Sequence, residues 1–323
     1  MDLQVLNSRF SGAMLGFAIG DAMGMPAQFL TREQIRRYYG KPIITFTRAH
    51  EGHASEFLPQ GSYTDDTQMM LATAECLVEC GKMDPARQAD ALLAWYLNTV
   101  PRRTTMRANE LACKRLAAGK AWTKSGVFSC GCGAAMRMPP VGLFYFSDPQ
   151  ELVRAALDDC IITHTDPRAK AASVAVAYLI ARLVQSNEHS SPGDQVLEIA
   201  DCVDPIDHDM SAMMRWVTQI VHLPPEEALF EIGTSSDSLE VVPAATYCFL
   251  KYPRHFALAT LAAANAGDAS DSTAALAGSF VGAFVGSGAI PRDWDEQVED
   301  SDVLKAIAEQ LANVAAKKGG VFS

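Results

Sequence analysis

Apolar residues recur every three or four positions along most of this chain, which is the spacing of one face of an α-helix. Phe10, Met14 and Phe17 follow this pattern in the segment 10–25. The pattern predicts further helices over residues 64–80, 84–100, 104–118, 148–163, 168–185, 195–202, 209–222, 226–232, 241–252, 256–266, 273–285 and 303–316. Alternating β-branched runs and Asn-Gly hairpin turns are nearly absent. No change in composition marks a linker, so we predict a single all-α domain over residues 1–323.

Glycine recurs at every fourth position in two of these segments, at residues 12, 16, 20 and 24 and again at 278, 282 and 286. Each glycine weakens a helix by about 1 kcal/mol relative to alanine, so a stripe of them indicates that another backbone comes very close. A membrane-spanning pair of helices is disfavoured, because Asp21 interrupts the first apolar run and the run is short. We expect the two stripes to pack near each other inside the domain.

Two segments are less regular. Residues 26–63 are rich in proline and glycine, and we expect a long loop with short helical pieces around 31–39 that forms the wall of a pocket. Residues 129–137 are mostly small, which suits close approach by a ligand or by another helix. The sequence does not distinguish between these two alternatives. Met138-Pro139-Pro140, which follows, is expected to break any helix.

Composition narrows the class of protein. The chain is 49% hydrophobic and 20% charged, and 27 Lys and Arg against 38 Asp and Glu give a net charge of −11. This balance disfavours nonspecific binding to nucleic acid or to anionic lipid. The first residues lack a basic and then apolar signal-peptide pattern. Eight cysteines without a C-x-x-C pair favour reduced thiols in a cytoplasmic protein over disulfides or zinc.

Two clusters of acids and hydroxyls stand directly before apolar helical segments. The first is Thr64-Asp65-Asp66-Thr67, and the second is Asp268-Ala269-Ser270-Asp271-Ser272-Thr273. Alone, Thr64 is best interpreted as a helix N-cap followed by acids that suit the positive end of the helix. Two such helix starts facing each other could also hold hard cations, since Mg²⁺ takes carboxylate and hydroxyl oxygens. His164, taken alone, is more typical of a cap or a satisfied core group than of a catalytic residue.

Together these segments resemble the ADP-ribosylglycohydrolase family, in particular the bacterial enzymes related to dinitrogenase-reductase-activating glycohydrolase. The resemblance lies in five motifs in order: Gly12 to Gly24, Thr64-Asp65-Asp66-Thr67, Gly131-Cys132-Gly133-Ala134-Ala135-Met136-Arg137, Ile162-Thr163-His164, and Asp268 to Thr273 with the following Ala275-Leu276-Ala277-Gly278. Each motif alone is weak, but five in order over nearly the whole chain are specific.

The resemblance implies an orthogonal helical fold with a binuclear Mg²⁺ centre, with Mn²⁺ as the other candidate. It implies hydrolysis of a bond between ADP-ribose and a side chain, often arginine, of a modified protein, or of a small ADP-ribose conjugate. The implied metal ligands are Thr64, Asp65, Asp66, Asp271 and Ser272, and Asp65 and Asp66 are also the implied catalytic carboxylates. The implied substrate-binding residues are Gln28, Gly131, Cys132, Gly133, Met136 and His164.

The sequence departs from the family pattern at four positions. Gln28 stands where a glutamate is usual, and glutamine cannot act as a general base. Ala269 stands at the first aspartate of the second metal motif, where Asp268, one residue earlier, is a candidate substitute ligand. Cys132 and Asp166 replace an asparagine and a histidine. The alternative interpretation is therefore a non-catalytic protein that binds ADP-ribose.

Overall fold

The computed structural model describes residues 2–99, 103, 107–187 and 189–318. Over these residues it contains sixteen α-helices and four short 3-10 helices, and two isolated bridges are the strand pairings it records. The all-α prediction is confirmed. The helices are α1 (Leu3–Gly24), α2 (Arg32–Tyr39), α3 (Asp65–Cys80), α4 (Pro85–Asn98), α5 (Arg107–Ala117), α6 (Met138–Phe144), α7 (Pro149–Thr163), α8 (Pro167–Val184), α9 (Pro192–Val203), α10 (His208–Gln219), α11 (Pro225–Ile232), α12 (Ser238–Lys251), α13 (Phe256–Ala264), α14 (Ser270–Val285), α15 (Arg292–Gln297) and α16 (Ser301–Lys318).

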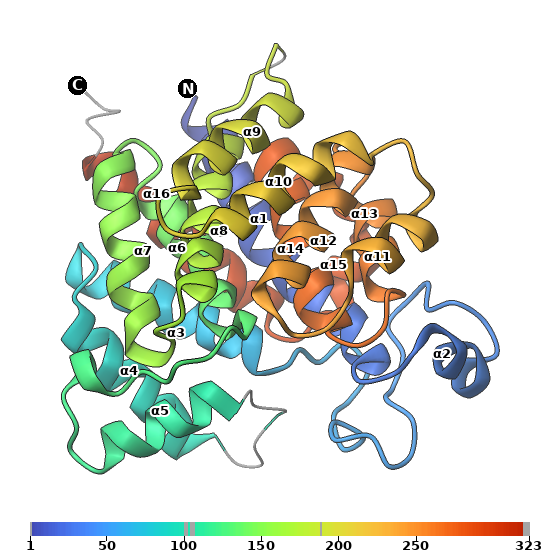
Figure 1. The fold of residues 1–323 in the computed structure, drawn as a ribbon, viewed down its shortest axis with the longest axis horizontal. Coiled ribbons are helices and arrows are strands. Elements are labelled where there is room, and N and C mark those ends of the chain that lie inside the picture. Colours follow the sequence, from blue (N-terminus) through green and yellow to red (C-terminus); the bar gives the residue numbers. More distant parts are fainter. Residues whose placement is uncertain (1, 100–102, 104–106, 188, 319–323) are drawn as a thin grey trace.

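The two glycine-striped helices, α1 and α14, lie against each other at the centre of the fold (Figure 1). A Cβ atom placed on Gly16 would lie 2.5 Å from the carbonyl oxygen of Gly278. A Cβ atom on Gly24 would lie 2.6 Å from the Cα atom of Asp271. The predicted contact between the stripes is confirmed, and it sets the end of α1 beside the beginning of α14.

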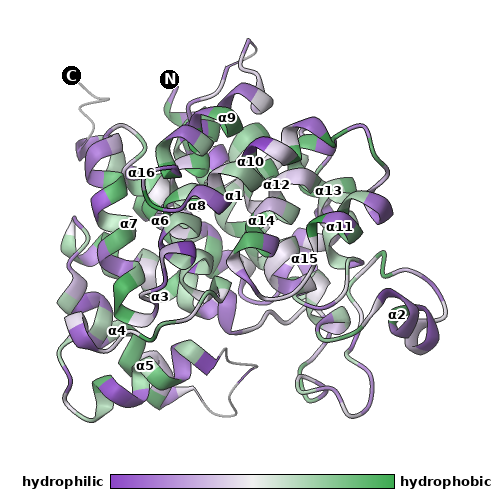
Figure 2. Ribbon diagram, viewed as in Figure 1, coloured by the Kyte–Doolittle hydropathy of each residue, from purple (hydrophilic) through white to green (hydrophobic). Residues whose placement is uncertain are grey.

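The other helices surround this pair, and burial follows their position. Every residue of α14 from Ser270 to Phe284 is buried, whereas α2, at the periphery, buries only Ile35. Figure 2 shows the same difference, with α2 largely polar. As expected, α2 is a short helical piece within the long irregular segment 26–63. None of the described helices is both long and apolar enough to cross a membrane.

One local prediction is wrong. Met138-Pro139-Pro140 does not end a helix but begins α6, in which the prolines occupy the first turn. Proline is tolerated there because the first N–H groups of a helix have no intrahelical partner. The 3-10 helix over Cys132–Arg137 runs directly into α6, so the small-residue segment is helical and buried from Cys132 onward. Helix α15 was not expected, and the expected limits at residues 100 and 104 lie outside the described residues.

Candidate functional site

A pocket of about 340 Å³ opens where the beginnings of α3, α5 and α14 meet the segments around Gln28 and Gly131. It contains most of the residues that the sequence singles out. Its lining comprises Gln28, Phe29, Asp65, Asp66, Arg107, Ala108, Ser129, Gly131, His164, Ser236, Asp268, Ala269 and Asp271. Cys132, Gly133 and Met136 are buried and lie outside this lining set.

Three buried carboxylates meet in the pocket because α3 and α14 begin there. Asp65 and Asp66 open α3, and Asp271 lies in the first turn of α14. Each has one buried oxygen without a hydrogen-bond partner: Oδ2 of Asp65, Oδ1 of Asp66 and Oδ1 of Asp271. These three oxygens are therefore available to bind a ligand in the pocket.

The charged forms of these acids are disfavoured. Burial, followed by the charges of Asp66 and Asp271, raises the pKa of Asp65 well above its usual range. Burial and then the charge of Asp21 raise the pKa of Asp66 to about 7. Burial and the charges of Asp66 and Asp21 likewise raise the pKa of Asp271. A cation placed among them would stabilise the ionised forms.

The remaining oxygen groups hold the cluster in place. Thr64 caps α3, as predicted, and its hydroxyl accepts from the Asp66 N–H at 3.2 Å. The Ser272 hydroxyl donates to Oδ2 of Asp66 at 2.6 Å. Asp21 accepts from the backbone N–H groups of Thr64 and Thr67 and from the Thr67 hydroxyl. Sequence analysis missed this role of Asp21, for which the only signal is an acid inside an apolar helical run.

Gln28 lies against the acid cluster from the other side. Its amide Nε2 donates to Oδ2 of Asp271, while its own Oε1 is buried without a partner. The ring of His53 contacts the Gln28 carbonyl at 3.1 Å (Nε2 to O). The amide therefore occupies one Asp271 oxygen that a carboxylate at this position would leave free.

Asp268, the candidate substitute ligand, lies in the wall of the same pocket but is exposed. Its pKa is raised by partial burial and by the charge of Glu240, not by the acids of the cluster. Asp268 and Phe29 both have positive φ, 56° and 64°. The Phe29 N–H donates to the Asp268 carbonyl at 2.8 Å, and the Asp268 N–H donates to the Leu30 carbonyl at 2.8 Å. Positive φ at two non-glycine residues is strained, and these bonds hold it at the pocket mouth.

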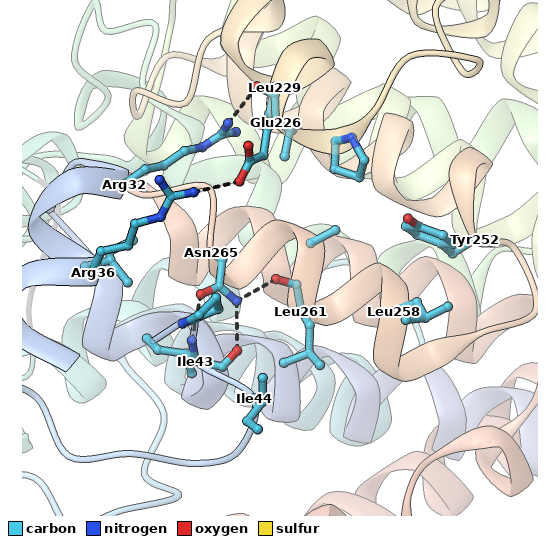
Figure 3. A pocket seen from close by; sticks show the side chains of 14 residues that line it. Arg32, Arg36, Ile43, Ile44, Glu226, Leu229, Tyr252, Leu258, Leu261 and Asn265 are labelled. Carbon is cyan, nitrogen blue, oxygen red and sulfur yellow. Dashed lines mark hydrogen bonds and ion pairs between the residues drawn. The ribbon is translucent and has the colours of Figure 1, made fainter. Parts of the chain in front are cut away.

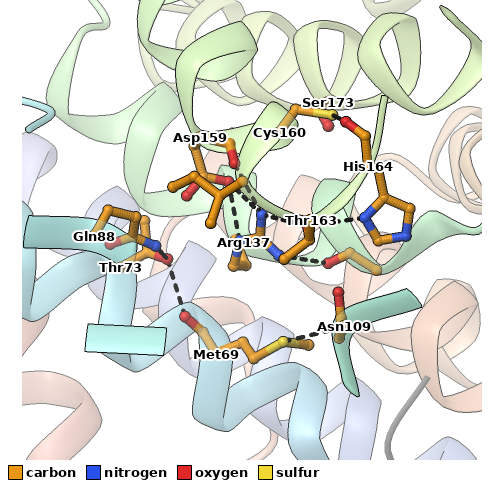
Figure 4. Close-up of polar contacts among 12 residues, drawn as sticks. Met69, Thr73, Gln88, Asn109, Arg137, Asp159, Cys160, Thr163, His164 and Ser173 are labelled. Atoms are coloured by element: carbon orange, nitrogen blue, oxygen red, sulfur yellow. Dashed lines mark hydrogen bonds and ion pairs between the residues drawn. The ribbon is translucent and has the colours of Figure 1, made fainter. Parts of the chain in front are cut away.

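A buried polar network lies behind the Gly131 wall (Figure 4). The fully buried guanidinium of Arg137 pairs with Asp159 at 2.8 Å and donates to the Thr163 hydroxyl at 3.0 Å. That hydroxyl lies 2.9 Å from Nδ1 of His164. In the sequence, Arg137 is only the last residue of a motif. Its pairing could not be predicted because Asp159 and Thr163 lie on a different helix, α7.

A second pocket, of about 320 Å³, lies between α2, α11 and α13 (Figure 3). Its walls are mostly apolar, and Arg36 pairs there with Glu226 at 2.9 Å. None of the candidate residues lines it.

Among the described residues, no three His, Cys, Asp or Glu side chains stand in a ready-made metal-binding arrangement. The donor chemistry nevertheless fits a hard cation, since three carboxylates with free oxygens and a serine hydroxyl converge and Mg²⁺ takes oxygen ligands together with water.

The family model for ADP-ribosylglycohydrolase matches residues 2–320. The chain belongs to the ADP-ribosylglycohydrolase family. This confirms the resemblance drawn from the five motifs. The chain is accordingly a hydrolase that acts on glycosyl bonds of ADP-ribose.

Several relatives match over most of their length. An uncharacterised protein of Archaeoglobus fulgidus is 35% identical over 95% of this chain and 96% of its own. The ADP-ribosyl-[dinitrogen reductase] glycohydrolase of Rhodospirillum rubrum is 26% identical, covering 97% and 98%. The ADP-ribosylarginine hydrolase Tri1 of Serratia proteamaculans is 26% identical, covering 95% and 80%. A solved structure titled ADP-ribosylglycohydrolase-related protein complex has the same fold, with a TM-score of 0.78 at 24% identity over 97% of this chain and 99% of its own.

Proposed function

We propose that this member of the family cleaves the bond between ADP-ribose and the guanidinium group of a modified arginine, with two divalent cations held at the acid cluster. Mg²⁺ is the proposed ion and Mn²⁺ the other candidate. The observation that carries the proposal is the convergence of three buried carboxylates with unpaired oxygens in the pocket. Without a cation, clustering buried carboxylates in this way destabilises the folded protein, and a bound cation would offset that cost.

Thr64, Asp65 and Asp66 would hold the cations from α3, and Asp271 and Ser272 from α14. Ions held there would supply Lewis-acid chemistry, orienting ribose hydroxyls and lowering the pKa of a water molecule. The chain itself supplies a negative field beside the reacting carbon, from Asp65 and Asp66, which stabilises the positive charge that develops there during cleavage.

The side chain of Gln28 cannot accept the proton that the attacking water releases. Its amide does not ionise, and it is bound to Asp271. The acceptor of the water proton is therefore assigned to Asp65 or Asp66, the two carboxylates that α3 brings into the pocket.

The residues at the mouth of the pocket suggest which leaving group the site accepts. Phe29 is 58% exposed and lines the pocket together with the Asp268 carboxylate. An aromatic face and a carboxylate at one site are the two groups that bind a guanidinium best. The name of one relative agrees, the ADP-ribosylarginine hydrolase Tri1. An arginine-linked protein is thus the favoured substrate, and a small conjugate with the same linkage would fit equally. None of the eight cysteines, which all lie in the described residues, forms a disulfide, in keeping with the proposed cytoplasmic location.

The test combines calorimetry and turnover. Metal-free protein is titrated with Mg²⁺ or Mn²⁺, and release of ADP-ribose is then followed from arginine-linked and serine-linked peptides. We expect two metal equivalents and faster release from the arginine peptide. Asp271→Asn should lose metal and turnover, whereas the control Glu231→Gln, which removes the same charge from exposed α11, should behave as wild type. Failure to bind metal or to release ADP-ribose would overturn the proposal.

One observation favours a second candidate, a protein that binds ADP-ribose without cleaving it. Gln28 replaces a potential acid and occupies an oxygen of Asp271. This candidate predicts ADP-ribose binding by calorimetry without release from either peptide. It also predicts that Gln28→Glu with Ala269→Asp creates turnover. A double variant that binds metal and ADP-ribose and still releases nothing would count against it.

A further inference from the structure

We propose that Arg137, acting through the Thr163 hydroxyl, holds His164 in the neutral form whose proton is on Nε2, so that His164 is a permanent hydrogen-bond donor into the pocket. Arg137 and Thr163 are then positioning residues, and His164 touches the ligand. The assignment of that ligand to an oxygen of ADP-ribose rests on the proposed function. The assignment of the proton does not.

The first step is the orientation of the guanidinium. Arg137 is completely buried, and it is bound through Nε and NH2 to the Asp159 carboxylate, at 2.9 and 2.8 Å. Its NH2 group also donates to the Asp159 carbonyl at 3.2 Å. A guanidinium donates only and does not lose its proton in proteins. The bond from NH2 to Thr163 Oγ1, at 3.0 Å, therefore has a fixed direction.

The second step is the Thr163 hydroxyl. One of its lone pairs is taken by Arg137, and its proton needs an acceptor in this buried site. The partner recorded for it within the described residues, besides Arg137, is Nδ1 of His164 at 2.9 Å. With the hydroxyl donating, Nδ1 must be unprotonated. The opposite direction would leave the Thr163 proton without an acceptor, at a cost of about 1–3 kcal/mol.

The third step is the state of the His164 ring. Burial, and then the charge of Arg137, lower its pKa to about 3, against the opposite effect of Asp166. The ring is therefore neutral, and with Nδ1 unprotonated its one proton is on Nε2. That Nε2 atom is buried and has no partner, while His164 belongs to the lining of the pocket. Gly131 borders this atom, since a Cβ atom placed on Gly131 would be in van der Waals contact with Nε2, at 3.7 Å.

The chemical consequence is that His164 does not act as a base. Its protonated Nε2 is suited to an acceptor such as a ribose hydroxyl or a phosphate oxygen. It presents the same donor over the whole neutral range of pH, because the ring does not titrate there. The buried pair of Arg137 and Asp159, which touches no ligand, gains a function as the anchor of this relay.

The experiment is long-range ¹⁵N–¹H NMR of histidine-labelled protein, with the His164 resonances assigned by their loss in His164→Gln. We expect an unprotonated Nδ1 and a protonated Nε2, both unchanged from pH 5.5 to about pH 8.5. Thr163→Val, which removes the hydroxyl and keeps the shape, should move both resonances toward averaged values of two tautomers. Thr163→Ser, which keeps the hydroxyl, should restore the wild-type pattern.

A protonated Nδ1 in the wild type, or identical spectra in Thr163→Val, would overturn the inference. Titration of the protein with ADP-ribose gives the second readout. Thr163→Val should weaken its binding about 3- to 10-fold, the loss expected for one hydrogen bond, and Thr163→Ser should not. If the expected tautomer is seen but ADP-ribose binds to neither protein, the relay stands and the ADP-ribose ligand is wrong.

Discussion

The contact between α1 and α14 gives the sharpest test of how this fold builds its site, through the single substitution Gly16→Ala. A Cβ atom there would stand 2.5 Å from the carbonyl oxygen and 2.9 Å from the carbonyl carbon of Gly278. Contacts below 3.0 Å are essentially never observed for real Cβ atoms. Both atoms belong to the backbone of α14, so no side-chain rotation relieves the clash, and the two helices must separate.

Two opposite effects determine how much Gly16→Ala changes the free energy of unfolding. Alanine favours the helix over glycine by about 1 kcal/mol. Overpacking a tight core costs about 1–3 kcal/mol, and the upper end applies because backbone is displaced along a whole helix. The net expectation is a loss of about 2 kcal/mol, or roughly 3 °C in Tm for a chain of this size.

Gly193→Ala is the matched control. Gly193 lies in the first turn of α9, and the nearest atom to its added Cβ would be the Ser191 hydroxyl at 3.9 Å. The same substitution should therefore be neutral or stabilise the protein by up to about 1 kcal/mol. Thermal unfolding followed by circular dichroism measures both.

Gly16→Ala should also weaken the metal site, because α1 leads into Gln28 and α14 carries Asp271. We expect Gly16→Ala to bind Mg²⁺ more weakly in calorimetry, at a temperature where the protein is still folded, and Gly193→Ala to bind as wild type. Equal or higher stability of Gly16→Ala would show that α1 and α14 are not in backbone contact, and the argument from the glycine stripe would fall.

Three further predictions concern the buried charges. Gln28→Glu adds a carboxylate beside Asp271, so Mg²⁺ should bind severalfold more tightly by calorimetry; unchanged affinity would refute this. The folded pKa of Asp66, about 7, is raised above its unfolded value of 3.8, so the folded state binds the extra proton between these two values and stability falls as pH rises through that window. The Tm of metal-free protein should then fall from about pH 5 to pH 7 and level off above it, and saturating Mg²⁺ should reduce the fall; a flat profile would contradict it. Asp159→Asn leaves Arg137 buried and unpaired and should cost about 3–5 kcal/mol in urea unfolding, while a loss below 1 kcal/mol would show that the pair is hydrated.

Much of the fold could be predicted from the sequence because its signals are local or periodic. The three- and four-residue apolar spacing locates most helices, and a cap such as Thr64 depends only on its own segment. The glycine stripes predict a long-range contact, since a helix face without side chains has little use except close packing. The prolines at 139 and 140 misled because proline ends a helix or begins one according to what precedes it, and the 3-10 helix before them had no clear signal.

The partners inside the site could not be predicted in this way. In the sequence, Asp21 argued against a membrane helix and lay within the first motif without an assigned role, but its carboxylate accepts hydrogen bonds from the start of α3. The amide of Gln28 reaches Asp271, 243 positions along the chain. Such bonds depend on how helices cross, and no local pattern encodes that geometry.

Asp268 illustrates why spacing in a motif does not determine a ligand. In the sequence it stands one residue from the usual position, and a shift of one residue in a loop seems small. In the structure its backbone has a φ of 56°, locked by bonds to Phe29 and Leu30, while Ala269 fills the expected position. A side chain on a left-handed residue leaves the chain in a different direction from its neighbours. The carboxylates of the cluster are thus those whose direction a helix start determines, Asp65, Asp66 and Asp271, and the role proposed for Asp268 is contact with the leaving group.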